Sequence, residues 1–378
     1  MLLGRHFERI NSSVTDILIL DRNGLEFLKN CIPLGMRYCS IDTRSSIPYL
    51  IKTKFFLRLF INIFKYGFKP ISLLCSIIEI LKPKSIVTFT DNSSMIGQIS
   101  LIFPSLLVLS VQNGVRTLPD DFVSHKSKFY IPIYFSFGKY EKNLITYLNV
   151  PYIEIYEVGS LKLGLFLSKD YQNGNNGICF ISQYRDSFLN SEDKISRDCL
   201  LRMEGIYRNL VVYSDSNIIN VAMHFGEESL YYEKEKEFYL NLSRTTNLIG
   251  NEASSFSSYK IAFSSSIIVA MDSTLAFEMF GCGKRVLFCD FAKDKLYTNR
   301  KGVDFLFDNL PKEVILETFD KAEMDSKINT LLSMSDAEYL TLTKKSRNYF
   351  IKQSKEFPHE IISTYIENNI NKELGKYV

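Results

Sequence analysis

The stretch VAMDSTLAFEMFGCGKRVLFCD, from Val269 to Asp290, decides how this chain folds. Its pattern predicts a buried strand, a tight turn, a short helix, a turn marked by glycine, and a second buried strand. The first turn holds Asp272, Ser273 and Thr274, all residue types that cap the N-terminus of a helix. A helix that starts at the end of a buried strand binds phosphate through its free N–H groups and its dipole. The turn is therefore either a phosphate site or an ordinary helix cap.

Glu278 lies one helical turn after Thr274, so both side chains point the same way from the helix start. A capping box places its acid three residues after the cap, and Glu278 does not fit that register from any of the three turn residues. It stands between Phe277 and Met279, where an unpaired carboxylate is costly. We therefore expect Glu278 to bind the hydroxyls of a ribose, the alternative being an ordinary helix glutamate.

Strands alternate with helices on both sides of this stretch, which predicts an α/β protein with parallel sheets covered on both faces. A polar segment rich in Asn and Gly divides the series in two. We expect two Rossmann-like domains that face a central cleft, at residues 1–168 and 178–350, joined by a linker at 169–177. The expected strands are 16–20, 85–90, 106–111, 130–137, 153–158, 178–181, 217–223, 259–264, 267–271 and 285–289.

The composition excludes several classes of protein. The chain has 378 residues, of which 46% are hydrophobic and 23% charged, and its net charge is +3. That is enough for two globular domains, and no block of like charge is long enough for a nucleic-acid arm. The seven cysteines form no CxxC pair and no Cys/His cluster, so we expect reduced core thiols in a cytoplasmic protein and no metal site. No signal peptide and no transmembrane helix are expected.

One segment has a composition that is compatible with membrane binding. Residues 53–84 mix Phe, Leu and Ile with Lys54, Arg58, Lys65 and Lys69. The first interpretation is a pair of core-facing helices with a solvated basic edge. The second is an amphipathic helix that lies in the plane of an anionic membrane, which would place the protein peripherally at the inner face of the cytoplasmic membrane.

Ligands of open parallel sheets bind beyond the carboxyl ends of the strands, so the polar residues there are the candidates. Asp91 is either a helix N-cap, a general base, or a carboxylate nucleophile at a sugar carbon. His224 is either a donor to a phosphate or a departing nucleotide, or a satisfied histidine. Arg116 offers a guanidinium fork, although an Asn-Gly turn with a surface Arg is the alternative. The N-terminal half supplies Asp91, Asn92, Gln112, Asn113, Gly114 and Arg116, and the C-terminal half supplies Ser182, Gln183, Arg185, His224, Ser273, Thr274 and Glu278.

Six pieces between Ser85 and Phe288 together resemble the bacterial surface-carbohydrate (O-antigen and capsule) biosynthesis proteins of the GT-B glycosyltransferase type. The pieces are SIVTFTDNSS, SVQNGVR, FGKYEKN, VGSLKLG, CFISQYR and DSTLAFEMFGCGKRVLF. The resemblance implies an acceptor site in the N-terminal domain, a nucleotide-sugar donor in the C-terminal one, and transfer without a metal or other cofactor. It also implies a C-terminal helix, 351–378, that packs back on the N-terminal domain.

From their positions at the strand ends, we expect Asp91 and His224 to be catalytic. We expect the acceptor or phosphate contacts to be Asn92, Gln112, Asn113, Gly114 and Arg116, and the donor-nucleotide contacts to be Ser182, Gln183, His224, Ser273, Thr274 and Glu278. The resemblance, mapped on this chain, gives the roles of three of these residues. Glu278 would hold the ribose, and Ser273 with Thr274 its phosphate.

The donor base is suggested by a second similarity. GT-B enzymes that use cytidylate-linked donors, such as sialyl- and Kdo-transferases, carry a His-Pro pair and a later Ser-Ser or Ser-Thr pair. This chain is similar at His224 and at Ser273-Thr274, but it has Phe225 where proline is expected. A CMP-linked acidic sugar is slightly favoured over UDP- or GDP-sugars.

The sequence therefore predicts a glycosyltransferase of lipopolysaccharide or capsule synthesis, acting on a glycan or lipid-linked acceptor. The alternatives are a nucleotide-sugar epimerase or polyol-phosphate transferase of the same fold, or a non-catalytic nucleotide-sugar or glycan-binding partner.

Overall fold

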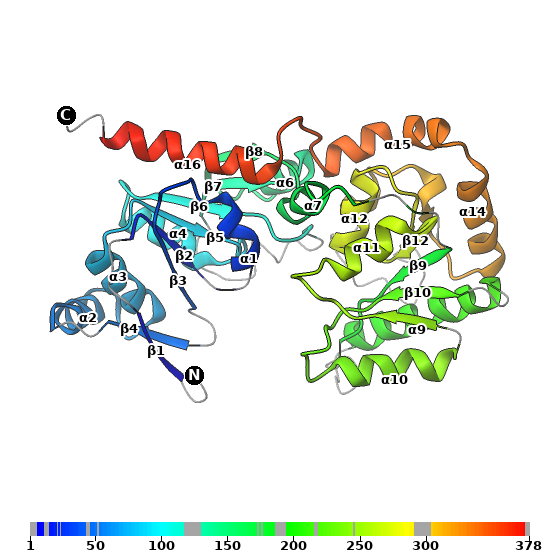
Figure 1. The fold of residues 1–378 in the computed structure, drawn as a ribbon, viewed down its shortest axis with the longest axis horizontal. Helices are drawn as coiled ribbons and strands as arrows, with labels where there is room; N and C mark the ends of the chain where they lie inside the picture. Colours follow the sequence, from blue (N-terminus) through cyan, green and yellow to red (C-terminus); the bar gives the residue numbers. More distant parts are fainter. Residues whose placement is uncertain are drawn as a thin grey trace. The chain divides into compact units, whose positions relative to one another are not determined.

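The chain divides into two compact units (Figure 1). Unit 1 comprises Met1–Gly114, Pro119–Leu165 and Ser354–Val378, and unit 2 comprises Val115–Leu118 and Phe166–Gln353. The computed structural model describes residues 6–10, 15–20, 22, 24–42, 46–50, 53–116, 130–171, 174, 177–185, 194–214, 218–244, 246–290 and 304–374. Residues 172–173 and 175–176 of the expected linker lie outside this set.

Unit 1 is built on a six-stranded parallel sheet in the order β3-β2-β5-β6-β7-β8. Every residue of β2 and β5 is buried, because both faces of the sheet are covered. The strands are β2 (Ile17–Leu20), β3 (Tyr38–Ile41), β5 (Ser85–Thr88), β6 (Leu107–Val111), β7 (Ile131–Ser136) and β8 (Tyr152–Glu157). A separate parallel pair joins β1 (His6–Arg9) and β4 (Ser46–Tyr49).

Helices of unit 1 complete its core. They are α1 (Leu25–Leu28), α2 (Thr53–Tyr66), α3 (Pro70–Leu81), α4 (Ser94–Ile102), α6 (Lys139–Tyr147), α7 (Leu161–Leu167) and α16 (Pro358–Leu374). The α3 helix buries Leu74, Cys75 and Ile78 in the core that it shares with β2 and β5. The last helix, α16, packs Tyr365 against the rings of Phe135 and Tyr156, at centroid distances of 5.3 and 5.0 Å.

Unit 2 contains a second six-stranded parallel sheet, in the order β11-β10-β9-β12-β13-β14. Its strands are β9 (Ile178–Ile181), β10 (Ile219–Ala222), β11 (Thr246–Ile249), β12 (Ile267–Ala270), β13 (Val286–Cys289) and β14 (Ile315–Leu316). Its helices are α9 (Lys194–Ser214), α10 (Tyr232–Leu242), α11 (Ser257–Ser264), α12 (Thr274–Gly281), α13 (Asp304–Phe307), α14 (Lys321–Ser333) and α15 (Asp336–Phe350). The predicted α/β class with parallel sheets is confirmed.

One predicted element is wrong in type. Residues 259–264 were expected as a strand, but they belong to the helix α11, which runs Ser257–Ser264. Its buried residues Ser258, Ala262 and Phe263 follow helical spacing, toward the sheet. A segment of six residues, four of them apolar, does not distinguish a buried strand from a short buried helix.

The described helices also bear on the expectation that the chain has no transmembrane helix. None of the helices in the ranges given above is long and apolar enough to cross a bilayer.

Gly24 fixes the start of α1 beside the end of β5, and its replacement tests that packing. Its φ is +84°, and a Cβ added there would lie 2.3 Å from the buried ring of Phe89. We expect Gly24→Ala to destabilise the protein by roughly 3 kcal/mol, from a left-handed backbone and a steric clash together. Chemical denaturation followed by circular dichroism measures this loss.

Gly35 is the matched control, because its φ is +85° but no atom of the described residues lies within 4 Å of an added Cβ. Gly35→Ala should cost only the backbone penalty, about 1 kcal/mol. Equal losses in Gly24→Ala and Gly35→Ala would show that the Phe89 contact contributes nothing.

Candidate functional site

The chain of unit 2 changes direction in the sheet between β9 and β12. It runs from β9 outward to β10 and β11, and then returns to β12 on the other side of β9. Ligands of such sheets bind at this switch point, outside the carboxyl ends of the strands. Gln183 follows β9 and Asp272 follows β12, and Gln183 Nε2 donates to Asp272 Oδ1 at 2.8 Å. This hydrogen bond spans the switch point and defines the floor of the candidate site.

The N-terminus of α12 lies at the same edge. Ser273 is its N-cap, and the Ser273 hydroxyl makes no capping hydrogen bond. The Thr274 hydroxyl oxygen accepts from the backbone N–H of Val115, at 3.1 Å, which uses one of its two lone pairs. Within the part of the chain that the structure describes, the first turn of α12 thus presents the Ser273 hydroxyl and backbone N–H groups without a partner.

Glu278 lies one turn deeper in α12 and is only 1% exposed. Its Oε2 accepts a hydrogen bond from Tyr259 Oη, on α11, at 2.6 Å. Burial and the neighbouring carboxylate raise the pKa of Tyr259 well above its ordinary value, so the phenol stays a donor. The ribose contact was expected because a buried Glu278 carboxylate needs a hydrogen-bond partner. Tyr259 is such a partner within the protein, so the ribose contact stays a prediction.

The turn after β10 is held by a carboxylate that the sequence did not single out. Glu235, on α10, is fully buried. It accepts from the backbone N–H groups of His224 and Phe225, both at 2.9 Å, and from the Ser182 hydroxyl. Burial raises the pKa of Glu235, while these hydrogen bonds act in the opposite direction.

The Ser182 hydroxyl, predicted as a donor-nucleotide contact, is hydrogen-bonded within unit 2. Besides donating to Glu235, it accepts from Tyr239 Oη at 2.8 Å and from the backbone N–H of Tyr184 at 3.2 Å. The side chain is buried and joins β9 to α10.

The imidazole of His224, unlike the Ser182 hydroxyl, has no hydrogen-bond partner among the described residues. Its ring meets the Phe225 ring edge-on, and within the described part of the chain no group forms a hydrogen bond with its ring nitrogens. Burial, helped by the guanidinium of Arg185, lowers the pKa of His224 from 6.5 to about 4. The ring is therefore neutral at pH 7, with one N–H to donate. Arg185 itself is exposed, just beyond β9.

In unit 1 the switch point lies between β2 and β5, and Asp91 follows β5. The Asp91 carboxylate is buried, and its Oδ2 accepts from Tyr134 Oη, on β7, at 2.8 Å. Asp91 is not the cap of the next helix, because Ser93 holds that position in α4. Asn92 beside it is exposed.

Gln112, after β6, is wholly engaged inside unit 1. Its Nε2 donates to Gly114 O at 2.9 Å and to Glu141 Oε1 at 2.6 Å, and its Oε1 accepts from Phe137 N at 2.6 Å. Both amide protons are thus used, so Gln112 shapes the turn after β6. Asn113 in that turn is half-buried.

Arg116 is buried, at 8% exposure, which excludes the alternative of a surface arginine. Its place in the same short segment as Val115 assigns it to unit 2.

The structure therefore groups the predicted residues by unit. Gln183, His224, Ser273 and Thr274 converge on the unit 2 edge, with Glu278 buried behind them, while Asp91 and Asn92 lie at the unit 1 edge. Sequence reasoning missed Glu235, Tyr259 and Tyr134. Among the described residues, no cluster of three or more His, Cys, Asp or Glu side chains is suited to a metal ion.

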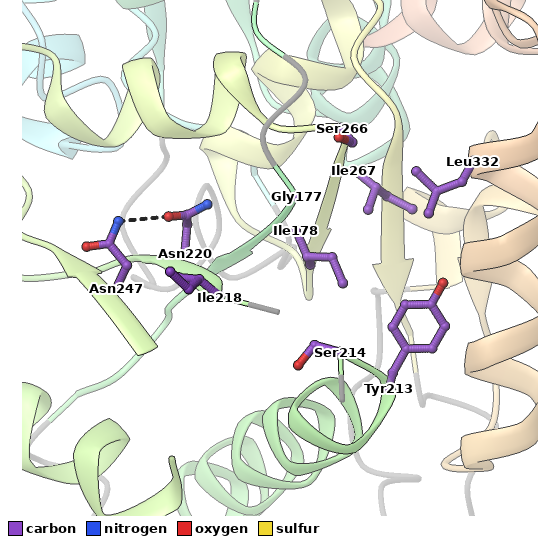
Figure 2. Close-up of a pocket in the computed structure, with 10 residues that line it drawn as sticks. All are labelled: Gly177, Ile178, Tyr213, Ser214, Ile218, Asn220, Asn247, Ser266, Ile267 and Leu332. Carbon is purple, nitrogen blue, oxygen red and sulfur yellow. Dashed lines mark hydrogen bonds between the residues drawn. The ribbon is translucent and has the colours of Figure 1, made fainter. Parts of the chain in front are cut away.

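A pocket of about 820 Å³ occupies the opposite edge of the unit 2 sheet (Figure 2). Gly177, Ile218 and Ser266, which line it, each precede a strand, so the pocket lies at the amino ends of β9, β10 and β12. Asn247 Nδ2 donates to Asn220 Oδ1 across its wall, at 2.8 Å. It has no part in the carboxyl-end site.

Comparison with known proteins identifies relatives of the chain. A family model described as "putative O-antigen biosynthesis protein" matches residues 109–359. The solved wall teichoic acid polymerase TagF is similar, with a TM-score of 0.52 and 12% identity over 96% of this chain and 92% of that one. No curated protein sequence matches the chain.

Two UDP-GlcNAc 2-epimerases are also similar in structure. The Methanocaldococcus jannaschii enzyme, in complex with UDP-GlcNAc and UDP, has a TM-score of 0.53 and 12% identity over 93% of this chain and 99% of that one. The Neisseria meningitidis enzyme, bound to UDP-GlcNAc, has a TM-score of 0.50 and 14% identity over 94% and 99%. At such identities the likeness shows the fold, which is the GT-B fold.

The low pKa of His224 has a direct test. We expect its ring protons, assigned by comparison with His224→Gln, to titrate near pH 4 in an NMR experiment. Because the folded-state pKa lies below that of the unfolded chain, the stability from neutral His224 should decline as pH falls from about 6.5 toward 4. A bound phosphate should raise the pKa, since it favours the imidazolium. Titration between pH 6 and 7 in the unliganded protein would contradict the buried, unpartnered environment.

Proposed function

The chain belongs to this family of O-antigen biosynthesis proteins, and from that premise we propose that it is a glycosyltransferase of surface-polysaccharide synthesis. It transfers a sugar from a nucleotide-sugar donor to a glycan or lipid-linked acceptor. One observation carries the proposal: hydrogen-bond donors with no partner in the described protein gather at the switch point of unit 2.

These donors suit the phosphate of a nucleotide. The Ser273 hydroxyl, the α12 N-terminus, neutral His224 and the Arg185 cation come from three adjacent strands, which lie about 5 Å apart. An N-terminal helix dipole and a guanidinium both favour an anion. Donors fixed before the reaction stabilise the charge that develops on the departing phosphate at little reorganisation cost.

The acceptor side of the reaction is assigned to Asp91 in unit 1. Tyr134 donates to one carboxylate oxygen and orients the group at the carboxyl edge of the sheet. In the proposed step the acceptor hydroxyl oxygen bonds to the sugar carbon and its proton passes to Asp91. The bond from that carbon to the phosphate oxygen breaks, and the nucleotide leaves with the electron pair.

The donor is proposed as a CMP-linked acidic sugar, with UDP-sugars as the competing class. His224 and the Ser273-Thr274 pair support the first, and the UDP-GlcNAc held by two similar structures supports the second. Glu278 is proposed to bind the ribose once the Tyr259 hydroxyl rearranges. Rearrangement is feasible because the phenol is a protonated donor that can serve a ribose oxygen as well.

A nucleotide-sugar epimerase is the second candidate function, favoured by the same two structures. An epimerase needs no acceptor, so turnover of a nucleotide sugar by the protein alone distinguishes it from a transferase.

Nucleotide binding is the first test of the site. We expect CMP or UDP to raise the melting temperature of the purified protein, since a ligand that binds only the folded state stabilises it. Ser273→Ala combined with Arg185→Gln should weaken nucleotide affinity at least tenfold, because the phosphate loses a hydroxyl donor and a charge-assisted contact, together worth about 2 kcal/mol. Isothermal titration calorimetry measures the change.

Ser266→Ala is the matched control, because Ser266 lies at the opposite end of β12, beside the pocket of Figure 2. It should bind nucleotide as the unmodified protein does. The site assignment fails if CMP, CDP, UDP and GDP all leave the melting temperature unchanged, or if the double variant binds normally.

Asp91→Asn separates chemistry from donor binding. We expect it to lower transfer at least 100-fold, the usual share of a general base, while nucleotide affinity is unchanged. Tyr134→Phe keeps the carboxylate but removes its hydrogen bond, so its loss should be smaller. Complementation of a deletion strain, scored by surface glycan on gels, provides the readout. Full complementation by Asp91→Asn would favour a non-catalytic binding partner.

A further inference from the structure

The α2 helix of unit 1 carries two apolar faces. Its inner face packs on α3: Phe55 is buried, and the buried Asn62 donates to Ser76 Oγ at 3.0 Å. Since residues follow each other at about 100° around a helix, Phe55 and Asn62 share one side of α2. Figure 1 shows α2 beside α3 at the margin of unit 1.

The outer face of α2 is apolar as well, although it faces solvent. A surface helix normally presents polar residues there. At about 100° per residue, its large side chains form one arc of about 140°. Phe60 is 61% exposed and Phe64 is 78% exposed, with ring centroids 4.7 Å apart. The arc consists of Phe56, Leu57, Phe60, Ile61 and Phe64, and Phe68 follows it in the next turn, 78% exposed. We call these six residues the α2 apolar face.

Cations line one edge of the α2 apolar face. Lys54, Arg58 and Lys65 fall within about 40° of one another around the helix, directly beside Ile61. Lys69 follows at the start of α3. The helix contains no Asp or Glu, and the acid near this edge is Glu79 of α3, 3.6 Å from Arg58.

We propose that the α2 apolar face docks in the plane of an anionic phospholipid bilayer, with its aromatic rings among the acyl chains and its cations at the headgroups. The apolar face is contiguous, as in interaction sites and unlike the scattered exposed residues of ordinary surfaces. A basic edge beside a Phe-rich face is the arrangement of helices that lie in the membrane interface. The helix has 14 residues, too few to span the roughly 30 Å of hydrocarbon.

Charge selects a bilayer as the occupant rather than a second copy of this chain. Two copies meeting through this face with their α2 helices antiparallel would bring the Lys54, Arg58 and Lys65 edges together, and like charges repel. An anionic lipid surface instead attracts these cations, and the long side chains of Lys54 and Lys65 reach the headgroups.

Vesicle flotation with the full chain tests the proposal. The unmodified protein should float with phosphatidylglycerol/phosphatidylcholine vesicles and not with phosphatidylcholine alone, and added salt should weaken the binding. Phe60→Gln combined with Phe64→Gln should bind at least tenfold more weakly, because two rings no longer enter the bilayer. Lys54→Gln combined with Lys65→Gln should also lose at least tenfold, at roughly fivefold for each charge.

Leu230→Gln is the matched control, because Leu230 is 93% exposed in unit 2, outside the α2 apolar face. It should float as the unmodified protein does, and all variants should keep the unmodified melting temperature, since the changed side chains are exposed. The proposal is overturned if the unmodified protein does not float with anionic vesicles, or if the Phe60/Phe64 variant floats equally well. It is also overturned, in favour of a second copy, if that variant turns a dimer into a monomer in sedimentation velocity while vesicle binding is absent. Nucleotide binding does not enter this readout, so its outcome is independent of the proposed transferase activity.

Discussion

The buried carboxylate of Glu235 holds the carboxyl edge of the unit 2 sheet in place. It accepts from the amides of two consecutive residues after β10 and from the hydroxyl that follows β9. A buried carboxylate is stable only when its lone pairs are filled in this way, and the turns that fill them are fixed in return. The orientation of His224 therefore depends on a residue that cannot itself contact a ligand. Removing this carboxylate would free two amide groups in a buried place and loosen the turn that carries the imidazole.

Unit 1 uses a related device at its own carboxyl edge. The amide of Gln112, after β6, holds the backbone after β7 through Phe137 and reaches Glu141 on α6. In each unit one buried polar group joins two neighbouring strand ends and the helix beyond them. The groups without a partner among the described residues, such as the Ser273 hydroxyl and the imidazole of His224, then lie on a rigid edge. Such an arrangement favours catalysis by groups already in position, because little reorganisation is needed when charge develops.

The sequence predicts the strands of both sheets well where apolar runs are long or end in polar turns. β2, β5, β9 and β12 are examples, because a strand buried on both faces reads as a continuous apolar run. The turn before α12 can also be predicted from the sequence, because three consecutive residues of N-cap type are unusual. The role of Glu235 is not visible, because α10 is rich in charges and one buried glutamate looks like the exposed ones beside it. Tyr259 was missed for another reason: its segment was assigned to a strand, so nothing placed it opposite Glu278.

The sequence leaves two interpretations of residues 53–84 open, and the reason is physical. Periodicity measures whether apolar residues share a face, but α2 has one apolar face toward α3 and a second toward solvent. Only the packing of α2 on α3 in the structure shows which of the two apolar faces is buried. Asp91 and the α2 apolar face belong to the same unit, which the resemblance assigns to the acceptor. A lipid-linked acceptor diffuses in the plane of the bilayer, so a unit docked there meets it at a high effective concentration. The membrane face and the acceptor site would then serve one function, with the nucleotide drawn from solution by unit 2.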